Sequence, residues 1–331
     1  MKLLVIGVFL SLFFAGCKDS GTPDVSKLLK DRKIIRFDRD LFTQDKAHPN
    51  IEMLSRKYGH YFDLYAEGVL QLGKVSDSTF VNLLPLFLQD SIINEVCDSV
   101  ALIFADMSEQ EKDLSKAWAY YEWYFPDKII PDVYTHISGF NQSIVVDSAA
   151  IGISLDNYLG ENCIFYSMMV TPVPMYARRK MTGQNVVKDA LYGWISAEFP
   201  FYPQANDLVS GMIYQGKLMY LLEKIFPFYD KQRLFDFSGE QLKWCEENER
   251  GIWTFLIENE YLFTTQQMII MKYMTDAPFT SGMPTESPGK AVVWSGYRIV
   301  QEYMKKKDCS LQELMDEQDY HKILRIAGYR P

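Results

Sequence analysis

The chain offers few side chains at the spacing that catalysis or metal binding needs. Its four histidines are His48, His60, His136 and His321, and no two of them lie three or four residues apart. Because a helix presents residues i and i+4 on one face, a zinc-binding helix needs two histidines at that spacing. The G-x-S-x-G elbow, the G-x-x-x-x-G-K-[ST] loop and the G-x-G-x-x-G turn are also missing. We therefore expect no catalytic motif, no metal and no cofactor, and we expect each histidine to be structural or on the surface.

The residue whose chemistry the sequence predicts most directly is Cys17. Lys2 supplies a positive charge, an apolar run follows over residues 3–14, and the small pair Ala15-Gly16 precedes the cysteine. A cationic end, an apolar stretch of about 7–15 residues and small residues at the cleavage site are typical of a secretion signal. The run is shorter than the roughly 20 residues that span a bilayer. We predict a lipoprotein signal peptide over residues 1–16 and a lipid on Cys17; the alternative is an ordinary signal peptide beside an incidental cysteine.

Residues 17–30 are predicted to be the lipidated cysteine and a polar tether. One acyl chain holds a protein to a membrane only marginally, so stable attachment needs the two or three chains that bacterial lipoproteins carry. The body is then expected in the cell envelope, attached to the inner or the outer membrane. It would lie in the periplasm, with exposure on the cell surface as the other possibility.

The composition predicts one globular domain over residues 31–331. The chain is 48% hydrophobic and contains no long Pro-, Gly- or Ser-rich linker, so it can bury a sizeable core. The formal net charge of −9 argues against nucleic acid as a partner, because phosphate binding needs clustered Lys and Arg. Its 21 Tyr and 21 Phe favour an aromatic core and groove.

Four further cysteines, Cys97, Cys163, Cys245 and Cys309, are too far apart for a C-x-x-C zinc site. In an oxidising periplasm they can form up to two disulfides. Buried free thiols are the alternative, and the sequence leaves both open.

Helical periodicity dominates residues 49–124. Apolar residues recur there at three- and four-residue spacing, for example over residues 83–88 and 92–103, which indicates amphipathic helices. Ser108 followed by Glu111 predicts a capping box at the start of the last of these helices. Pro126 and Pro131 end this helical region.

The next segment has the composition of short strands. β-Branched and aromatic residues predict strands at residues 132–138, 143–146 and 150–155, in addition to an earlier strand at residues 34–37. Three strands so close in sequence favour a small, mostly antiparallel sheet. We therefore expect an α+β fold that is predominantly helical, with the small sheet packed on helices.

Two longer helices are predicted in the second half of the chain. The first follows Asn206-Asp207 and ends at Pro227, and the second covers residues 290–305. Gly216 falls within the apolar stripe of the first helix. Since glycine inside a helix costs roughly 1 kcal/mol relative to alanine, we expect a packing reason for it, such as close approach of the strand layer.

Three blocks give the chain a family resemblance: IGISLDNYLG at residues 151–160, MIYQGKLMYLLEKIFP at 212–227 and ESPGKAVVWSGYRIVQEYM at 286–304. With the N-terminal signal, they resemble the gliding motility-associated lipoprotein GldB family of Bacteroidota, in the same order over nearly the whole mature chain. The resemblance implies an envelope lipoprotein associated with gliding and with the protein-secretion apparatus tied to it. Related proteins also occur in bacteria that do not glide.

The same blocks distantly resemble predicted zinc proteases with an H-E-x-x-H helix, whose histidines bind zinc and whose glutamate is the general base. This likeness implies a zincin-like body in which Gly216 and Tyr220 replace the histidines and Lys217 replaces the glutamate. Glycine offers no ligand and an ammonium repels a dication, so the zinc mechanism is lost. The other residues expected around this former metal site and groove are Asp156, Glu286 and Tyr297.

Two roles are open for Lys217. In the first, it pairs with Glu286 or Asp156 across the former metal site, which keeps the groove without its reaction. In the second, it reaches solvent beside the apolar stripe.

Three functions are compatible with these features. The first is a non-catalytic, pseudo-metalloprotease-like lipoprotein that binds envelope protein partners of the gliding or secretion machinery. The second is an envelope hydrolase acting on peptide or cell-wall substrates through an unrecognised site. The third is a carrier of lipids or small molecules, suggested by the aromatic content alone.

Overall fold

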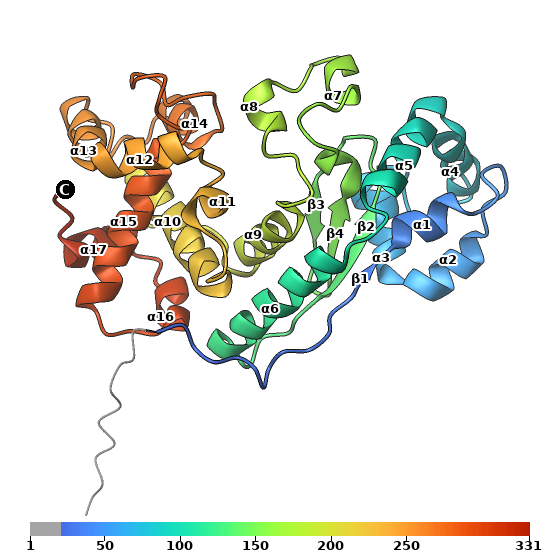
Figure 1. Cartoon of the computed structure of the whole chain (residues 1–331), viewed down its shortest axis with the longest axis horizontal. Coiled ribbons are helices and arrows are strands. Elements are labelled where there is room, and N and C mark those ends of the chain that lie inside the picture. Colours follow the sequence, from blue (N-terminus) through green and yellow to red (C-terminus); the bar gives the residue numbers. More distant parts are fainter. Residues whose placement is uncertain (1–20) are drawn as a thin grey trace, which may run out of the picture.

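The computed structural model describes residues 21–331, so the predicted signal peptide and Cys17 lie outside the described part of the chain. The protein is mainly helical with one small sheet, which confirms the predicted fold class (Figure 1). The first elements are β1 (Ile34–Ile35), α1 (Phe37–Phe42), α2 (Ile51–Tyr58), α3 (His60–Leu64), the π-helical turn η1 (Tyr65–Val69), α4 (Phe80–Gln89), α5 (Ser91–Ile103) and α6 (Ser108–Tyr124). The predicted first strand is thus shorter than expected, because Phe37 already begins α1.

The sheet and a second set of helices follow. The sheet region contains β2 (Asp132–His136), β3 (Ile144–Val146), β4 (Ala150–Ser154) and the 3₁₀ turn η2 (Leu155–Tyr158). The remaining helices are α7 (Phe165–Met168), α8 (Met175–Arg178), α9 (Val186–Glu198), α10 (Leu208–Ile225), α11 (Lys231–Phe235), α12 (Gly239–Glu247), α13 (Glu249–Glu258), α14 (Gln267–Met274), α15 (Ala291–Lys306), α16 (Leu311–Asp316) and α17 (Tyr320–Ala327).

The sheet is mixed, so the prediction of a mostly antiparallel sheet is wrong. Its strand order is β1-β2-β4-β3, with β1 and β4 both parallel to β2 and only β3 antiparallel to β4. All five residues of β4 are buried, whereas β3 has one buried residue between two half-buried ones. The fully buried strand therefore takes the inner position beside β2, and β3 forms the edge.

Helices cover both faces of the sheet (Figure 1). On one face α9 packs against β3 so closely that a Cβ added to Gly193 would lie 2.9 Å from the side chain of Ile144. On the other face the ring of Tyr61 in α3 stacks on Tyr134 of β2 with centroids 3.9 Å apart. The sheet is thus a central layer between α9 and the N-terminal helices.

Helix α10 begins and ends where the sequence predicts. The Asp207 carboxylate accepts a hydrogen bond from the backbone N–H of Ser210 at 3.0 Å and caps the helix, which ends shortly before Pro227. Its predicted apolar stripe is buried. Gly216 does mark a close approach, but to α15 instead of the strand layer: an added Cβ would lie 2.3 Å from the carbonyl carbon of Gly296.

The predicted capping box at α6 is wrong. The carboxylate of Asp106 accepts hydrogen bonds from the backbone N–H of Ser108 at 2.8 Å and from its hydroxyl at 3.1 Å. Glu111 instead accepts from the backbone N–H of Ile34 at 3.2 Å. The serine hydroxyl therefore has a nearer acceptor, and the glutamate is used to attach β1 to the helix.

Buried apolar side chains from Ile34 to Tyr329 form one connected cluster, and the single domain over residues 31–331 stays a prediction. Cys97, Cys163 and Cys245 are free thiols, and the alternative of a buried free thiol applies to Cys245, whereas Cys97 and Cys163 are half-buried. Among residues 21–331 there is no helix whose length and apolar character would suffice to cross a membrane. The first described residues run along the side of the molecule opposite α8 and α14 (Figure 1).

Candidate functional site

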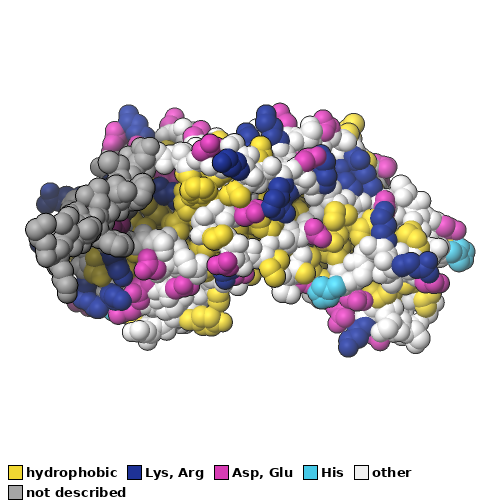
Figure 2. Space-filling model, turned by 90° about the horizontal axis from the view of Figure 1, so that it is seen from below, with side chains coloured by type: hydrophobic (Ala, Val, Ile, Leu, Met, Phe, Trp, Pro, Cys, Tyr) yellow, Lys and Arg dark blue, Asp and Glu magenta, His cyan; other side chains and the backbone are white. Residues whose placement is uncertain are grey.

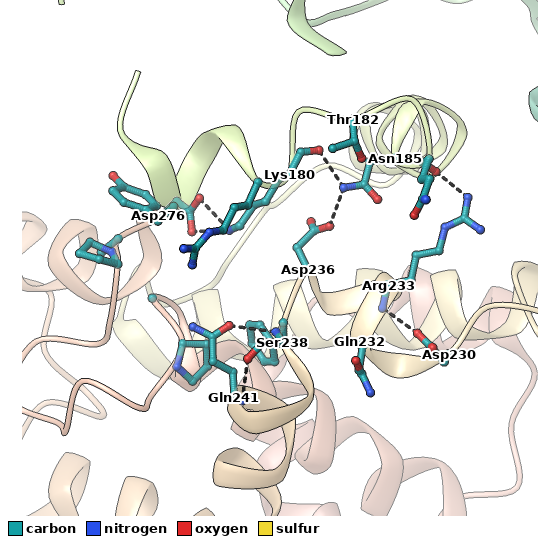
Figure 3. Close-up of a pocket in the computed structure, with 18 residues that line it drawn as sticks. Lys180, Thr182, Asn185, Asp230, Gln232, Arg233, Asp236, Ser238, Gln241 and Asp276 are labelled. Atoms are coloured by element: carbon teal, nitrogen blue, oxygen red, sulfur yellow. Dashed lines mark hydrogen bonds and ion pairs between the residues drawn. The ribbon is translucent and has the colours of Figure 1, made fainter. Parts of the chain in front are cut away.

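A polar cleft of about 580 Å³ opens between three segments of the chain. Residues 176–185 lead from α8 into α9, residues 230–241 contain α11 and the start of α12, and residues 276–289 precede α15 (Figure 3). Its uncharged polar lining includes Thr182, Asn185, Gln232, Ser238 and Gln241. Amides and hydroxyls both donate and accept hydrogen bonds, so this surface suits a polar ligand with both kinds of group.

Side-chain contacts join the three segments across the cleft. Lys180 Nζ lies 2.8 Å from both carboxylate oxygens of Asp276. Asn185 Nδ2 donates to Asp236 Oδ1 at 3.1 Å (Figure 3). Because each segment is bonded to another that is far away in sequence, the walls of the cleft hold one another in place.

The segment 230–241 owes its shape to two helix starts in quick succession. Asp230 caps α11 by accepting from the backbone N–H of Arg233 at 2.8 Å, and Ser238 and Gln241 form a capping box at α12. Between them Asp236 ends α11 with φ of +55°. This left-handed residue turns the chain, and its carboxylate comes to lie in the cleft wall.

A second cavity of about 210 Å³, which we call the inner cavity, is bounded by α9, α10 and the start of α15. Asp236 and Phe237 belong to the walls of both cavities. Lys188 is buried there and forms ion pairs with Asp236 and, at 3.3 Å, with Asp189. Burial by itself lowers the pKa of Lys188, but the two carboxylates outweigh burial and raise this pKa above its ordinary value. Lys188 is therefore charged at neutral pH.

The three sequence blocks that carry the family resemblance meet at the inner cavity. Tyr158 of the first block donates to Asp189 in the cavity wall at 3.1 Å. The second block supplies Gln215 and Met219, and the third supplies Lys290. The residues that give the chain its resemblance thus surround one place in the fold.

The face of α10 that lines the inner cavity differs from the predicted one. Gln215 and Met219, four residues apart, are in the cavity wall. Gly216 and Tyr220 lie one position further along, which turns them by about 100° around the helix axis. If a histidine pair had a counterpart facing this cavity, it would be Gln215 and Met219, and an amide and a thioether are not ligands that zinc prefers.

Lys217 takes neither of its two predicted positions. It is only 1% exposed, so it does not reach solvent. Its Nζ donates to the carbonyl oxygens of Met315 at 3.1 Å and Glu317 at 2.7 Å and lies 5.3 Å from the ring centre of Tyr320. Burial lowers the pKa of Lys217 to about 8, with the nearby acidic residues opposing this shift. Lys217 thus satisfies carbonyl groups at the C-terminal end of α16.

The predicted ion pair of Lys217 with Asp156 or Glu286 is wrong, because both acids lie elsewhere. The buried carboxylate of Asp156 accepts from the backbone N–H groups of Ser138 at 3.2 Å and Phe140 at 2.6 Å. Burial raises the pKa of Asp156, and these hydrogen bonds oppose the shift. Asp156 therefore stabilises the turn after β2, while Glu286 is exposed.

Tyr220 and Tyr297 do come together, with ring centroids 6.5 Å apart. The hydroxyl of Tyr297 donates to Glu223 Oε1 at 2.7 Å and accepts from Gln301 Nε2 at 2.5 Å. Burial raises the pKa of Tyr220 to about 12. Neither tyrosine is among the residues that line the two cavities, so this pair packs α10 against α15.

Four charged residues of the inner cavity, Lys188, Asp189, Asp236 and Lys290, were not predicted from the sequence. The ion pair of Lys188 with Asp236 joins two helices that are distant in sequence, so periodicity does not indicate it. Lys290 could have been singled out from the sequence, because it stands directly before an apolar helix within the third block. Burial lowers the pKa of Lys290, and Asp276 opposes this shift.

The histidines have the structural or surface positions predicted for them. His136 is buried with Nδ1 2.8 Å from the hydroxyl of Tyr61, His321 Nε2 lies 2.8 Å from Asp207, and the other two are exposed. Across residues 21–331, His, Cys, Asp and Glu side chains do not gather in groups of three that could hold a metal ion.

The chain matches a family model described as gliding motility protein GldB over residues 18–331. Neither the comparison with curated proteins nor the comparison with solved structures gave a match. The family resemblance drawn from the three blocks is therefore confirmed. The likeness to zinc proteases and the zincin-like body remain predictions.

Proposed function

This chain belongs to the gliding motility protein GldB family, and from that premise we propose that it is a lipid-anchored envelope protein that binds a protein partner without catalysing a reaction. The partner would be a component of the gliding machinery or of the secretion apparatus tied to it. The observation that carries the proposal is the polar cleft between α8–α9 and α11–α12.

The anchor would be the lipid on Cys17, followed by the short polar tether. Residues 21–33 run along the side of the body opposite α8 and α14, so a tether starting there would leave the cleft segments facing away from the membrane (Figure 1). Seen from below, Lys and Arg side chains are interspersed with Asp and Glu (Figure 2). A mixed surface of this kind attracts anionic lipid weakly, which favours the lipid as the main attachment. The body would then lie in the periplasm or on the cell surface.

The rim of the cleft supports a protein as the ligand. Met175 is 48% exposed beside the lining residue Tyr176, and on the other side Phe279 is 37% exposed beside Pro278. Exposed apolar side chains around a polar, hydrogen-bonding centre are what a partner chain can cover. Methionine suits such a rim because its flexible side chain adapts to the surface it contacts.

The lining of the cleft supports binding without catalysis. Its residues are amides, hydroxyls and charges that already have partners, such as Lys180 with Asp276. The α10 face toward the inner cavity presents Gln215 and Met219. A pseudoenzyme with a zincin-like body would keep the cavity of its catalytic relatives with such replacements.

The test places a photo-crosslinking amino acid at Gln184 or Gln232 of the full-length protein in a bacterium that makes it. Both side chains are exposed at the cleft. The control position is Glu52 on α2, whose side chain is 84% exposed. We expect one discrete product from the two cleft positions, identified by mass spectrometry as an envelope protein of the gliding or secretion machinery.

Equal products from the cleft and from the control position would contradict the proposal. So would turnover of peptide or cell-wall fragments by the purified full-length protein that is lost when cleft residues are replaced. That second result would establish the hydrolase instead.

A further inference from the structure

The position of Lys290 is fixed by the loop that precedes it. Lys290 is the N-cap residue of α15 and lines the inner cavity. The buried Thr280 hydroxyl oxygen accepts from the backbone N–H of Ala291 at 3.0 Å. Gly289 packs so tightly that an added Cβ would lie 1.9 Å from the carbonyl oxygen of Ala277. The backbone is therefore held on both sides of Lys290, which sets where its side chain can reach.

Three lysines line the two adjoining cavities, and they differ in their partners. Lys180 pairs with Asp276, and Lys188 pairs with Asp236. Within residues 21–331 the ammonium group of Lys290 forms no hydrogen bond and no ion pair. Among the described residues it is thus the one lysine of the two cavities that has no direct partner. Burial lowers the pKa of Lys290, and the carboxylates of Asp276 and Asp236, which form no ion pair with it, only partly oppose this shift.

We propose that Lys290 binds a carboxylate group of the partner polypeptide in the inner cavity, while the polar cleft binds the neighbouring backbone of that polypeptide. This inference rests on the proposed function, because it gives the chemistry of the partner at the same cleft. The single ammonium group of Lys290, which has no direct partner, can form an ion pair with one singly charged carboxylate. The carboxylates of Asp189 and Asp236 in the same wall would repel a phosphate dianion more strongly than a monoanion, and a dianion would need a second cation without a partner.

The polar cleft favours a polypeptide as the bearer of that carboxylate. Gln184, Gln232 and Gln241 lie along it, and each amide offers a donor and an acceptor as a peptide bond does. A cavity of about 580 Å³ has the size of sites that hold small ligands, which is enough for a short peptide segment. An ion pair at one end and amide contacts along the chain would together fix its direction.

The test is isothermal titration calorimetry with detergent-solubilised full-length protein. The probes are acetyl-Ala-Ala-Ala with a free C-terminal carboxylate, the same peptide amidated, and amidated acetyl-Ala-Asp-Ala. We expect a carboxylate-bearing peptide to bind at least about tenfold more tightly than the amidated trialanine. Preference for the free terminus indicates a chain end as the natural ligand, and preference for the aspartyl peptide indicates an acidic side chain.

The variants are Lys290→Met, which keeps the aliphatic stem, and Lys290→Arg, which keeps the charge. The matched control is Lys305→Met at the far end of the same helix, whose side chain is 63% exposed. We expect Lys290→Met to lose the preference for carboxylate, and Lys290→Arg and Lys305→Met to retain it. Because Lys290→Met removes a half-buried charge that has no direct partner, we expect a melting temperature equal to or above that of the wild type.

Equal affinity for the acid and the amide would overturn the carboxylate site, as would a preference that survives in Lys290→Met. Failure of all three peptides to bind at millimolar concentration would also overturn it. If the cleft positions nevertheless crosslink an envelope partner, the proposed function stands and this inference alone fails.

Discussion

Gly216 and Gly296 face each other where α10 crosses α15. A Cβ added to Gly216 would lie 2.3 Å from the carbonyl carbon of Gly296, and one added to Gly296 would lie 1.9 Å from the carbonyl oxygen of Met212. The two helices therefore touch backbone to backbone, which only residues without a side chain allow. Because α10 supplies Gln215 and Met219 to the inner cavity and α15 begins beside Lys290, this crossing also sets the width of the cavity.

Because the two backbones touch, we expect a single added methyl group at this crossing to lower the free energy of unfolding strongly. Gly216→Ala places a Cβ against rigid backbone, so we expect destabilisation by at least about 3 kcal/mol or failure to fold. The matched control is Gly251→Ala in α13, where an added Cβ meets no atom within 4 Å. That variant should gain about 0.5–1 kcal/mol from helix propensity. Urea unfolding of both variants checks the prediction, and a Gly216→Ala protein as stable as the wild type would contradict the close approach.

Because Lys217 is buried, we expect the protein to become more stable as the pH rises in the alkaline range. The pKa of Lys217 is about 8 in the folded protein against 10.5 in the unfolded chain, so between these values the unfolded state binds more protons. The free energy of unfolding therefore increases as pH rises through this range. Lys217→Met lacks this contribution and leaves the carbonyl oxygens of Met315 and Glu317 without their donor. We expect a loss of about 1–3 kcal/mol at pH 9.5 and a smaller loss at pH 7.5.

Chemical denaturation at the two pH values measures this difference. Lys305→Met is the control, because its exposed side chain should give the same small effect at both. If Lys217→Met loses less stability at pH 9.5 than at pH 7.5, burial does not lower the pKa of this lysine.

His136 predicts a loss of stability in acid. Burial lowers the pKa of His136 to about 3 from 6.5, so the unfolded chain binds the proton first as the pH falls. The protein should therefore lose about 1.4 kcal/mol of stability per pH unit from this group between pH 6 and pH 4. In His136→Gln this contribution to the pH dependence of stability should disappear. The variant also loses the contact with Tyr61. Exposed His48→Gln is the control and should keep the wild-type slope; parallel curves for all three proteins would argue against a buried neutral imidazole.

We expect the mature protein to carry a lipid covalently attached to Cys17. Cells grown with an alkyne-labelled fatty acid should incorporate label into the wild-type protein and into Cys97→Ala. In Cys17→Ala incorporation should fall to background, because the thiol at position 17 is the expected attachment site. Mass spectrometry of the mature N-terminus would locate the modification. Equal labelling of Cys17→Ala, or no label on the wild type, would favour an ordinary signal peptide.

The local elements of this fold were predictable from short stretches of sequence. Asp207 and Pro227 bracket α10, because a cap and a helix breaker act within a few residues of where they stand. Ser108 and Glu111 show the limit of such patterns. Asp106, only two residues earlier, takes the serine hydroxyl as a hydrogen-bond donor, so the same pattern gave the wrong cap.

The order of the strands was not predictable from their spacing. The chain visits β2, β3 and β4 in turn, yet β4 lies beside β2 because it is buried along its whole length. The closeness of these strands in sequence suggested a simple antiparallel sheet. Because β4 is buried along its whole length, it instead takes the inner position beside β2.

The sequence by itself determined the family, the mainly helical class and the three blocks that surround the candidate site. It did not determine what individual residues in those blocks do. Lys217 bonds to Glu317, 100 residues away, and Lys188 pairs with Asp236 on another helix. Capping and periodicity are set by hydrogen bonds and burial over a few residues, so they can be inferred from the chain. Which side chains meet depends on how whole helices cross, and contacts such as that between Gly216 and Gly296 set the crossing only once the chain is folded.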